Sequence, residues 1–161
     1  MRWTAVLLVL GISTAFICFG CTNTTPPITT SDDDPMINQI RQNAKLVQDV
    51  ARDDLGIDID FDQSGVEWLD GYVNRQRENG AADNADGLVS TLGSFYGECI
   101  VQTYGGEWHQ DASGWCVRFD EENAAYPFAK LQKQLENGPE DSVLSMFELI
   151  PIVFKRPARS E

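Results

Sequence analysis

The chain has 161 residues with 25 acidic and 12 basic side chains, and its formal net charge is −13 at pH 7. Such an acidic surface repels nucleic acid and anionic lipid headgroups, so both are poor partners for the folded part of the chain, whereas a basic protein is a suitable one. The length is enough for one domain that buries most of its unfolded surface without depending on disulfides.

The first 20 residues have the order of a bacterial secretion signal. Arg2 is their only charged side chain, an apolar run follows, and Gly20 is a small residue directly before Cys21. This order resembles the signal peptide and lipobox of bacterial lipoproteins, which implies cleavage after Gly20 and acylation of Cys21. An uncleaved helical anchor and a freely secreted protein are the alternatives.

The lipoprotein pattern implies a place in the bacterial cell envelope, on the periplasmic side of a membrane. Thr22 follows the acylated position where an inner-membrane retention signal would have Asp, so the outer membrane is favoured. Residues 21–34 are rich in Thr, Pro and Asp and cannot bury a core. They are predicted to be a flexible linker.

Helices are predicted in the next part of the chain. Asp34 and Pro35 have the form of a helix start, and Gly56 has the form of its end. The expected inward face of this helix is Ile37, Ile40, Ala44, Val47 and Val50.

Residues Ile57–Phe61 then alternate in polarity and predict a short strand or an extended connector. The capping box Ser64–Glu67 predicts a second helix to Arg77 with its inward face at Val66, Leu69, Tyr72 and Val73. After a loop at Gly80–Gly87, a third helix is predicted over Leu88–Tyr104, with Leu88, Leu92, Phe95, Cys99 and Ile100 inward. Gly93 and Gly97 on this helix would allow close approach of another element.

The last part of the predicted domain alternates strands and short helices. We expect, in chain order, a hairpin of Glu107–Gln110 and Trp115–Phe119, a strand at Ala124–Phe128, a helix at Ala129–Leu135, a helix from Pro139, a strand at Ile150–Phe154 and a disordered tail at 155–161. The predicted fold is therefore a single α+β domain over residues 35–154, with N-terminal helices followed by a small antiparallel sheet and helices packed on it.

Five short stretches between Val66 and Phe154 resemble a bacterial domain family of unknown function. They are Val66-Glu-Trp-Leu-Asp70, Leu92-Gly-Ser-Phe-Tyr-Gly-Glu98, Gly105-Gly-Glu-Trp108, Tyr126-Pro-Phe128 and Glu136-Asn-Gly-Pro-Glu-Asp-Ser142. The resemblance implies a compact α+β module and no particular reaction, cofactor or partner.

Cys99 and Cys116 are the two cysteines inside the predicted domain. In an oxidising envelope, a bridge between them would stabilise the fold by about 3 kcal/mol. Cys99 lies on the apolar stripe of its helix, whereas Cys116 would point away from the core if Trp115 and Val117 face it. A Cys99–Cys116 disulfide and two free thiols therefore remain alternatives.

Asp60–Gly65 matches the first six positions of a calcium loop, but Gly71 stands where the closing Glu should be. Capping of the following helix by the acidic run is the favoured interpretation. The only histidine, His109, is predicted to be a surface residue, because metal sites normally need several His or Cys ligands. No catalytic set, metal site or cofactor motif is predicted.

Glu98 is the candidate functional carboxylate, because it follows Gly97 in an apolar setting near Phe95 and Tyr96. The alternative is an ion pair with Lys130 or Lys133 that joins two helices. The chain is also rich in aromatic residues that would form either a binding cleft or part of the core. They are Trp68, Trp108, Trp115, Tyr72, Tyr96, Tyr104 and Tyr126.

The leading hypothesis from the sequence is a lipid-anchored envelope protein without enzymatic activity that binds an unknown protein partner, with a basic protein as the candidate. An immunity-type protein against a basic envelope toxin is a specific form of it. The alternative class is a glycan-binding or hydrolytic envelope protein that uses Glu98 with the aromatic residues.

Overall fold

The computed structural model describes residues 34–80 and 85–159. The predicted signal peptide, Cys21 and the linker up to residue 33 lie outside the described residues, as do residues 81–84 and 160–161. The elements in chain order are α1 (Pro35–Leu55), α2 (Gln63–Glu78), α3 (Ala85–Tyr104), β1 (Glu107–Asp111), β2 (Gly114–Arg118), β3 (Ala124–Ala125), α4 (Pro127–Asn137), the 3₁₀ helix η3 (Pro139–Asp141) and α5 (Val143–Val153).

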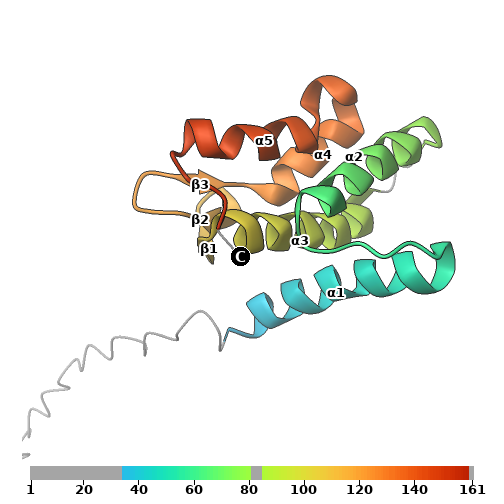
Figure 1. Cartoon of the computed structure of the whole chain (residues 1–161), viewed down its shortest axis with the longest axis horizontal. Coiled ribbons are helices and arrows are strands. Elements are labelled where there is room, and N and C mark those ends of the chain that lie inside the picture. Colours follow the sequence, from blue (N-terminus) through green and yellow to red (C-terminus); the bar gives the residue numbers. More distant parts are fainter. Residues whose placement is uncertain (1–33, 81–84, 160–161) are drawn as a thin grey trace, which may run out of the picture.

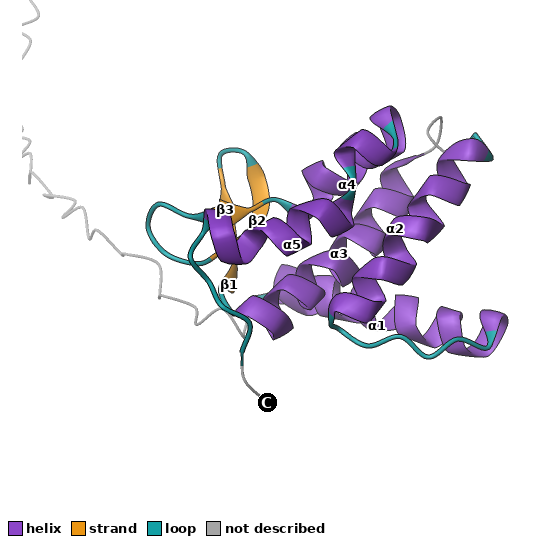
Figure 2. Ribbon diagram, turned by 45° about the horizontal axis from the view of Figure 1, so that its top comes forward, coloured by secondary structure: helices purple, strands orange, loops and turns teal. Residues whose placement is uncertain are grey.

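The α+β prediction is confirmed. Helix α3 runs through the middle of the molecule, with α1 on one side and α2, α4 and α5 on the other (Figure 1). The three strands form an antiparallel sheet in the order β1-β2-β3 at one end of the helices (Figure 2). The helices therefore supply most of the core, and the sheet closes one end of it.

Helix α1 begins and ends as its sequence predicts. The Asp34 carboxylate accepts a hydrogen bond of 2.7 Å from the Met36 N–H, and Gly56 ends the helix at φ 67°. This left-handed conformation favours glycine because it has no Cβ. The predicted inward face is confirmed except at its end, where Ala51 is buried and Val50 is 43% exposed.

The segment between α1 and α2 is an extended connector, one of the two predicted alternatives. Ile59 is buried, and its carbonyl oxygen accepts a hydrogen bond of 2.9 Å from Gln48 of α1. Helix α2 is capped by Asp62 rather than by the predicted Ser64. The Asp62 carboxylate accepts from the Gly65 N–H at 3.0 Å and from the Ser64 hydroxyl at 2.7 Å.

Helix α3 is buried on every side over nine consecutive residues, Leu92–Ile100. Its two central glycines make this possible. A Cβ at Gly97 would collide with the Trp108 ring, and a Cβ at Gly93 would collide with Phe128. The close approach predicted from the Gly93–Gly97 spacing therefore brings β1 and α4 against the helix backbone.

The hairpin is confirmed, with Trp108 opposite Val117 and His109 opposite Cys116. Val117 belongs to the hydrophobic core, whereas Cys116 faces away from it, as the alternation predicts, although both side chains are fully buried. Cys116 lies beside Asp111, whose carboxylate accepts a hydrogen bond of 2.7 Å from the Tyr126 hydroxyl. The segment that follows β3 thus covers the face of the hairpin that alternation assigned to solvent.

The predicted third strand is only two residues long, since Pro127 already begins α4. The strand predicted at Ile150–Phe154 is wrong, because Ile150–Val153 is the last turn of α5. A short apolar run does not distinguish a strand from a buried helical segment by periodicity alone. The buried residues Val143, Phe147 and Ile150 have helical spacing instead, and Ser142 caps the helix through the Ser145 N–H at 3.0 Å.

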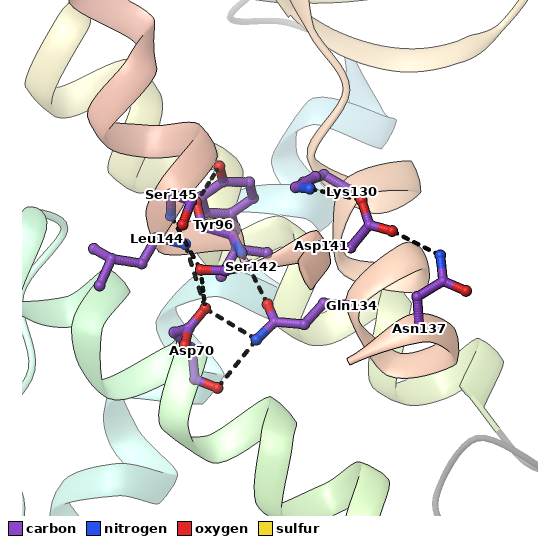
Figure 3. A network of polar contacts seen from close by, with 10 residues as sticks. Asp70, Tyr96, Lys130, Gln134, Asn137, Asp141, Ser142, Leu144 and Ser145 are labelled. Carbon is purple, nitrogen blue, oxygen red and sulfur yellow. Dashed lines mark hydrogen bonds and ion pairs between the residues drawn. The ribbon is translucent and has the colours of Figure 1, made fainter. Parts of the chain in front are cut away.

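A polar network connects α2, α4 and α5 inside the structure (Figure 3). One Asp70 oxygen accepts from the Ser142 hydroxyl at 2.6 Å and from the Gln134 side-chain amide at 2.9 Å. Gln134 is fully buried, and its oxygen accepts from the Val143 N–H at 2.9 Å. The Tyr96 hydroxyl of α3 donates to the Val143 carbonyl at 2.9 Å. These bonds fix the start of α5 against the other helices.

Replacing Gly97 by alanine tests the close approach of β1 to α3. We expect Gly97→Ala to lower the free energy of unfolding by about 1–3 kcal/mol, because the new Cβ must displace the Trp108 ring. Gly87→Ala on the same helix is the matched control, since a Cβ there meets no atom within 4 Å. It should be neutral or stabilising by up to about 1 kcal/mol. Urea denaturation measures both, and equal effects would contradict the assignment.

Candidate functional site

An apolar groove of about 400 Å³ lies between α1, α2 and the N-terminal half of α3. The second half of α1 lines one wall with Leu46, Val50 and Leu55, which are 51%, 43% and 50% exposed. Leu88 and Leu92 of α3 are also part of the lining. Large aliphatic side chains that share one concave surface in this way are typical of sites where another molecule binds.

Two aromatic side chains of α2 form the opposite wall of the groove. Trp68 and Tyr72 stack with their ring centroids 5.1 Å apart, and Trp68 also forms a T-shaped pair with Phe95 of the core. The Arg75 guanidinium lies over the Tyr72 ring at 5.9 Å. Trp and Tyr held in this way offer a rigid contact surface at little cost in conformational entropy.

On the α1 side, the charged residues beside the groove leave it with an acidic edge. Asp54 is part of the lining, and the neighbouring Asp53 is exposed. The basic side chains on this stretch of α1 already have acidic partners: Lys45 pairs with Asp49 at 3.1 Å, and Arg52 pairs with Asp49 and Asp58. Among the described residues, no ion pair forms with Asp53 or Asp54. A ligand with apolar groups and a positive charge would therefore match this surface.

Glu98 lies in a different part of the molecule from the groove. It is only 6% exposed, and one of its carboxylate oxygens accepts a hydrogen bond of 2.7 Å from the Trp108 indole N–H. The predicted alternative, an ion pair with a lysine of α4, does not form: Lys130 pairs with Asp141 at 3.0 Å. Glu98 thus fixes the Trp108 ring where it covers Gly97, while a catalytic role for Glu98 stays a prediction.

Cys99 and Cys116 are both buried free thiols, which is the second of the two predicted alternatives. Burial raises the pKa of the Cys99 thiol well above its usual value and also raises the pKa of Cys116. The Cys116 sulfur donates to the His109 carbonyl at 3.4 Å. Cys99 is therefore a side chain of the hydrophobic core, and Cys116 is a buried thiol on the other face of the hairpin. The structure contains the free thiols and not the disulfide.

Asp62 of the partial calcium loop has a capping function. Hydrogen bonds from the Ser64 hydroxyl and the Gly65 N–H lower the pKa of this carboxyl group. His109 is half-buried on β1. In residues 34–80 and 85–159, no group of three His, Cys, Asp or Glu side chains is arranged to hold a metal ion. The same part of the chain contains no helix that is both long and apolar enough to span a bilayer.

The aromatic residues do not form one cleft. Only Trp68 and Tyr72 line the groove, whereas Trp108 packs on Phe128 at 5.8 Å and Tyr104 on Phe147 at 4.8 Å in the core. Sequence reasoning missed the aliphatic wall of the groove. The signal for it was present in α1, whose apolar residues occupy more than one helical face: Leu46, Val50 and Leu55 lie beside the buried stripe.

Comparison of the chain with protein-family models, curated proteins and solved structures found no match. The resemblance of Val66–Phe154 to an uncharacterised bacterial family therefore stays a prediction, and the function has to be inferred from the chain itself.

Two substitutions at Glu98 separate its charge from its hydrogen bond. Glu98→Gln keeps an oxygen that accepts from the Trp108 indole, whereas Glu98→Leu leaves this buried N–H without a partner. Both variants remove the charge, so their difference reports the hydrogen bond. We expect Glu98→Leu to be less stable than Glu98→Gln by about 1–3 kcal/mol in urea denaturation. Equal stability of the two variants would show that the contact contributes nothing.

Proposed function

We propose that this chain is a lipid-anchored protein of the bacterial cell envelope whose folded domain binds another protein. The order of apolar segment, Gly20, Cys21 and polar linker supports the anchor. Two or more acyl chains on Cys21 would hold the protein on the membrane, because one chain alone gives only weak and reversible binding. The linker would then place the domain on the periplasmic side, with the outer membrane favoured by Thr22.

The groove between α1, α2 and α3 is the observation that carries the proposal of protein binding. Its aliphatic wall is about half exposed, its opposite wall is a Trp–Tyr stack, and Asp54 lines it, with the exposed Asp53 next to Asp54 in the chain. This combination fits an amphipathic helical segment that inserts aliphatic side chains and carries Lys or Arg at its border. A basic partner also agrees with the net charge of −13.

The anchor is tested by metabolic labelling with a fatty acid in the native host. The parent protein should incorporate the label and fractionate with membranes, because its Cys21 is acylated. Cys21→Ser should lose the label and retain the unprocessed N-terminal segment. Labelling of Cys21→Ser at the parental level would reject the anchor, and Cys18→Ser, which should remain labelled, is the control for a neighbouring thiol.

The groove is tested with a designed helical peptide that has Leu on one face and Lys on the other. It should bind the protein, and Val50→Asp should weaken binding about tenfold or more, because a carboxylate then points into the apolar groove. Val153→Asp is the matched control, since it changes an exposed helical valine in the same way outside the groove. Fluorescence anisotropy of the labelled peptide measures both affinities. Equal weakening by the two variants would reject the groove as the binding site.

A further inference from the structure

We propose that the C-terminal end of α5 rests on the surface of the bilayer that holds the anchor. Three large apolar side chains on this part of α5 are exposed to solvent: Leu149 at 46%, Ile152 at 74% and Val153 at 55%. Ile152 has the highest exposed fraction among the large apolar residues of the described chain. The inference rests on the anchor of the proposed function, since an unanchored domain would not be held near a membrane.

The three side chains form one continuous surface, which we call the α5 stripe. Their spacing of three and four residues places Leu149, Ile152 and Val153 side by side on the helix. The opposite face of α5 is buried through Phe147 and Ile150, so the stripe points away from the core. The only charged residue within α5 is Glu148. A helix end of this kind matches the interface between headgroups and acyl chains.

The charges next to the α5 stripe make the contact mainly apolar. Lys155 and Arg159 are exposed, and Arg156 is occupied by an ion pair with Asp120 at 3.0 Å and a hydrogen bond to the Phe119 carbonyl. The turn after Asp120 adds exposed acidic residues. Positive and negative groups therefore nearly balance here, so that contact with the bilayer does not depend on anionic lipids, which the acidic protein as a whole repels.

The place of the α5 stripe in the fold is what connects it to the anchor. The last turn of α5, residues 155–159 and the first turn of α1 lie at the same end of the molecule (Figure 1; Figure 2). Residues 155–159 of the predicted disordered tail are held at this end, because the Arg159 N–H donates to the Thr103 carbonyl of α3 at 2.7 Å. Residues 22–34 between Cys21 and α1 reach at most about 45 Å when extended. The anchor thus keeps the α5 stripe within reach of the bilayer.

Tethering explains why a small apolar surface is enough. A stable protein interface usually buries more than about 1,200 Å², which three side chains do not provide. A tethered domain meets its own membrane at a high effective concentration, so that a weak contact is populated. The end of α1 and the start of α3, which line the groove, lie at the opposite end of the molecule (Figure 1). Docking of α5 would therefore turn the groove away from the membrane.

Spin labels on the full chain test the contact. The protein is purified from host membranes, labelled through Ile152→Cys, and reconstituted into phosphatidylcholine vesicles; Val50→Cys in the groove is the control position. Collision rates with oxygen, which enters the bilayer, and with a water-soluble nickel chelate are measured by electron paramagnetic resonance. We expect the chelate to reach the label at position 152 at least about threefold more slowly than the label at position 50.

The double substitution Leu149→Asp with Val153→Asp should restore access of the chelate to position 152, whereas Leu46→Asp with Leu55→Asp should not. Equal access at positions 152 and 50 in protein that floats with the vesicles would overturn the α5 contact and leave the anchor intact. Protection that disappears when the protein is diluted in lipid would assign the α5 stripe to a second copy and overturn the proposal. Failure of the chain to float would reject the anchor, and the α5 contact with it.

Discussion

The burial of α3 on all sides is the constraint on which the rest of this structure depends. Nine consecutive residues of one helix are buried, so at each position the side chain must fit the space left by its neighbours, and where there is no space the residue must be glycine. Gly93 and Gly97 leave room for Phe128 and Trp108, which pack directly on the helix backbone. Glu98 lies in the same buried segment and needs a hydrogen-bond donor there, which the Trp108 indole supplies. The candidate functional carboxylate of the sequence is thereby part of the packing.

A second set of contacts determines which faces of the outer helices are left for other molecules. Asp70, Gln134 and Ser142 join α2, α4 and the start of α5 through partly buried hydrogen bonds. Because the start of α5 is fixed, Phe147 and Ile150 point inward and the α5 stripe points outward. Helix α1 behaves in the same way: its buried face packs on α3, so Leu46, Val50 and Leu55 remain exposed and line the groove.

The two exposed apolar surfaces lie toward opposite ends of the domain and differ in character. The groove is concave, aromatic on one wall and acidic at its edge, which suits a cationic amphipathic segment. The α5 stripe lies on one face of a single helix, at the end of the molecule where α1 begins. A tethered protein with one surface for its membrane and another for a partner would present the partner site at a defined height above the bilayer.

Interactions between residues close together in the sequence were sufficient to predict much of this fold. Helix α1 and the hairpin were predictable from the sequence alone, because their ends depend on residues close by in the chain. These are Asp34 with Pro35 and Gly56 for the helix, and the turn around Asp111–Gly114 for the hairpin. The order of the predicted helices and strands also indicated the α+β class, whereas the lipoprotein-type N-terminus lies outside the described residues and stays a prediction. Tertiary structure decided the remainder, because burial depends on residues that are distant in the chain. Tyr126 covers the face of the hairpin where Cys116 lies, and packing against α2 and α3 makes Ile150–Val153 helical rather than extended. The groove needed three helices at once, so that no single segment of the sequence contained it.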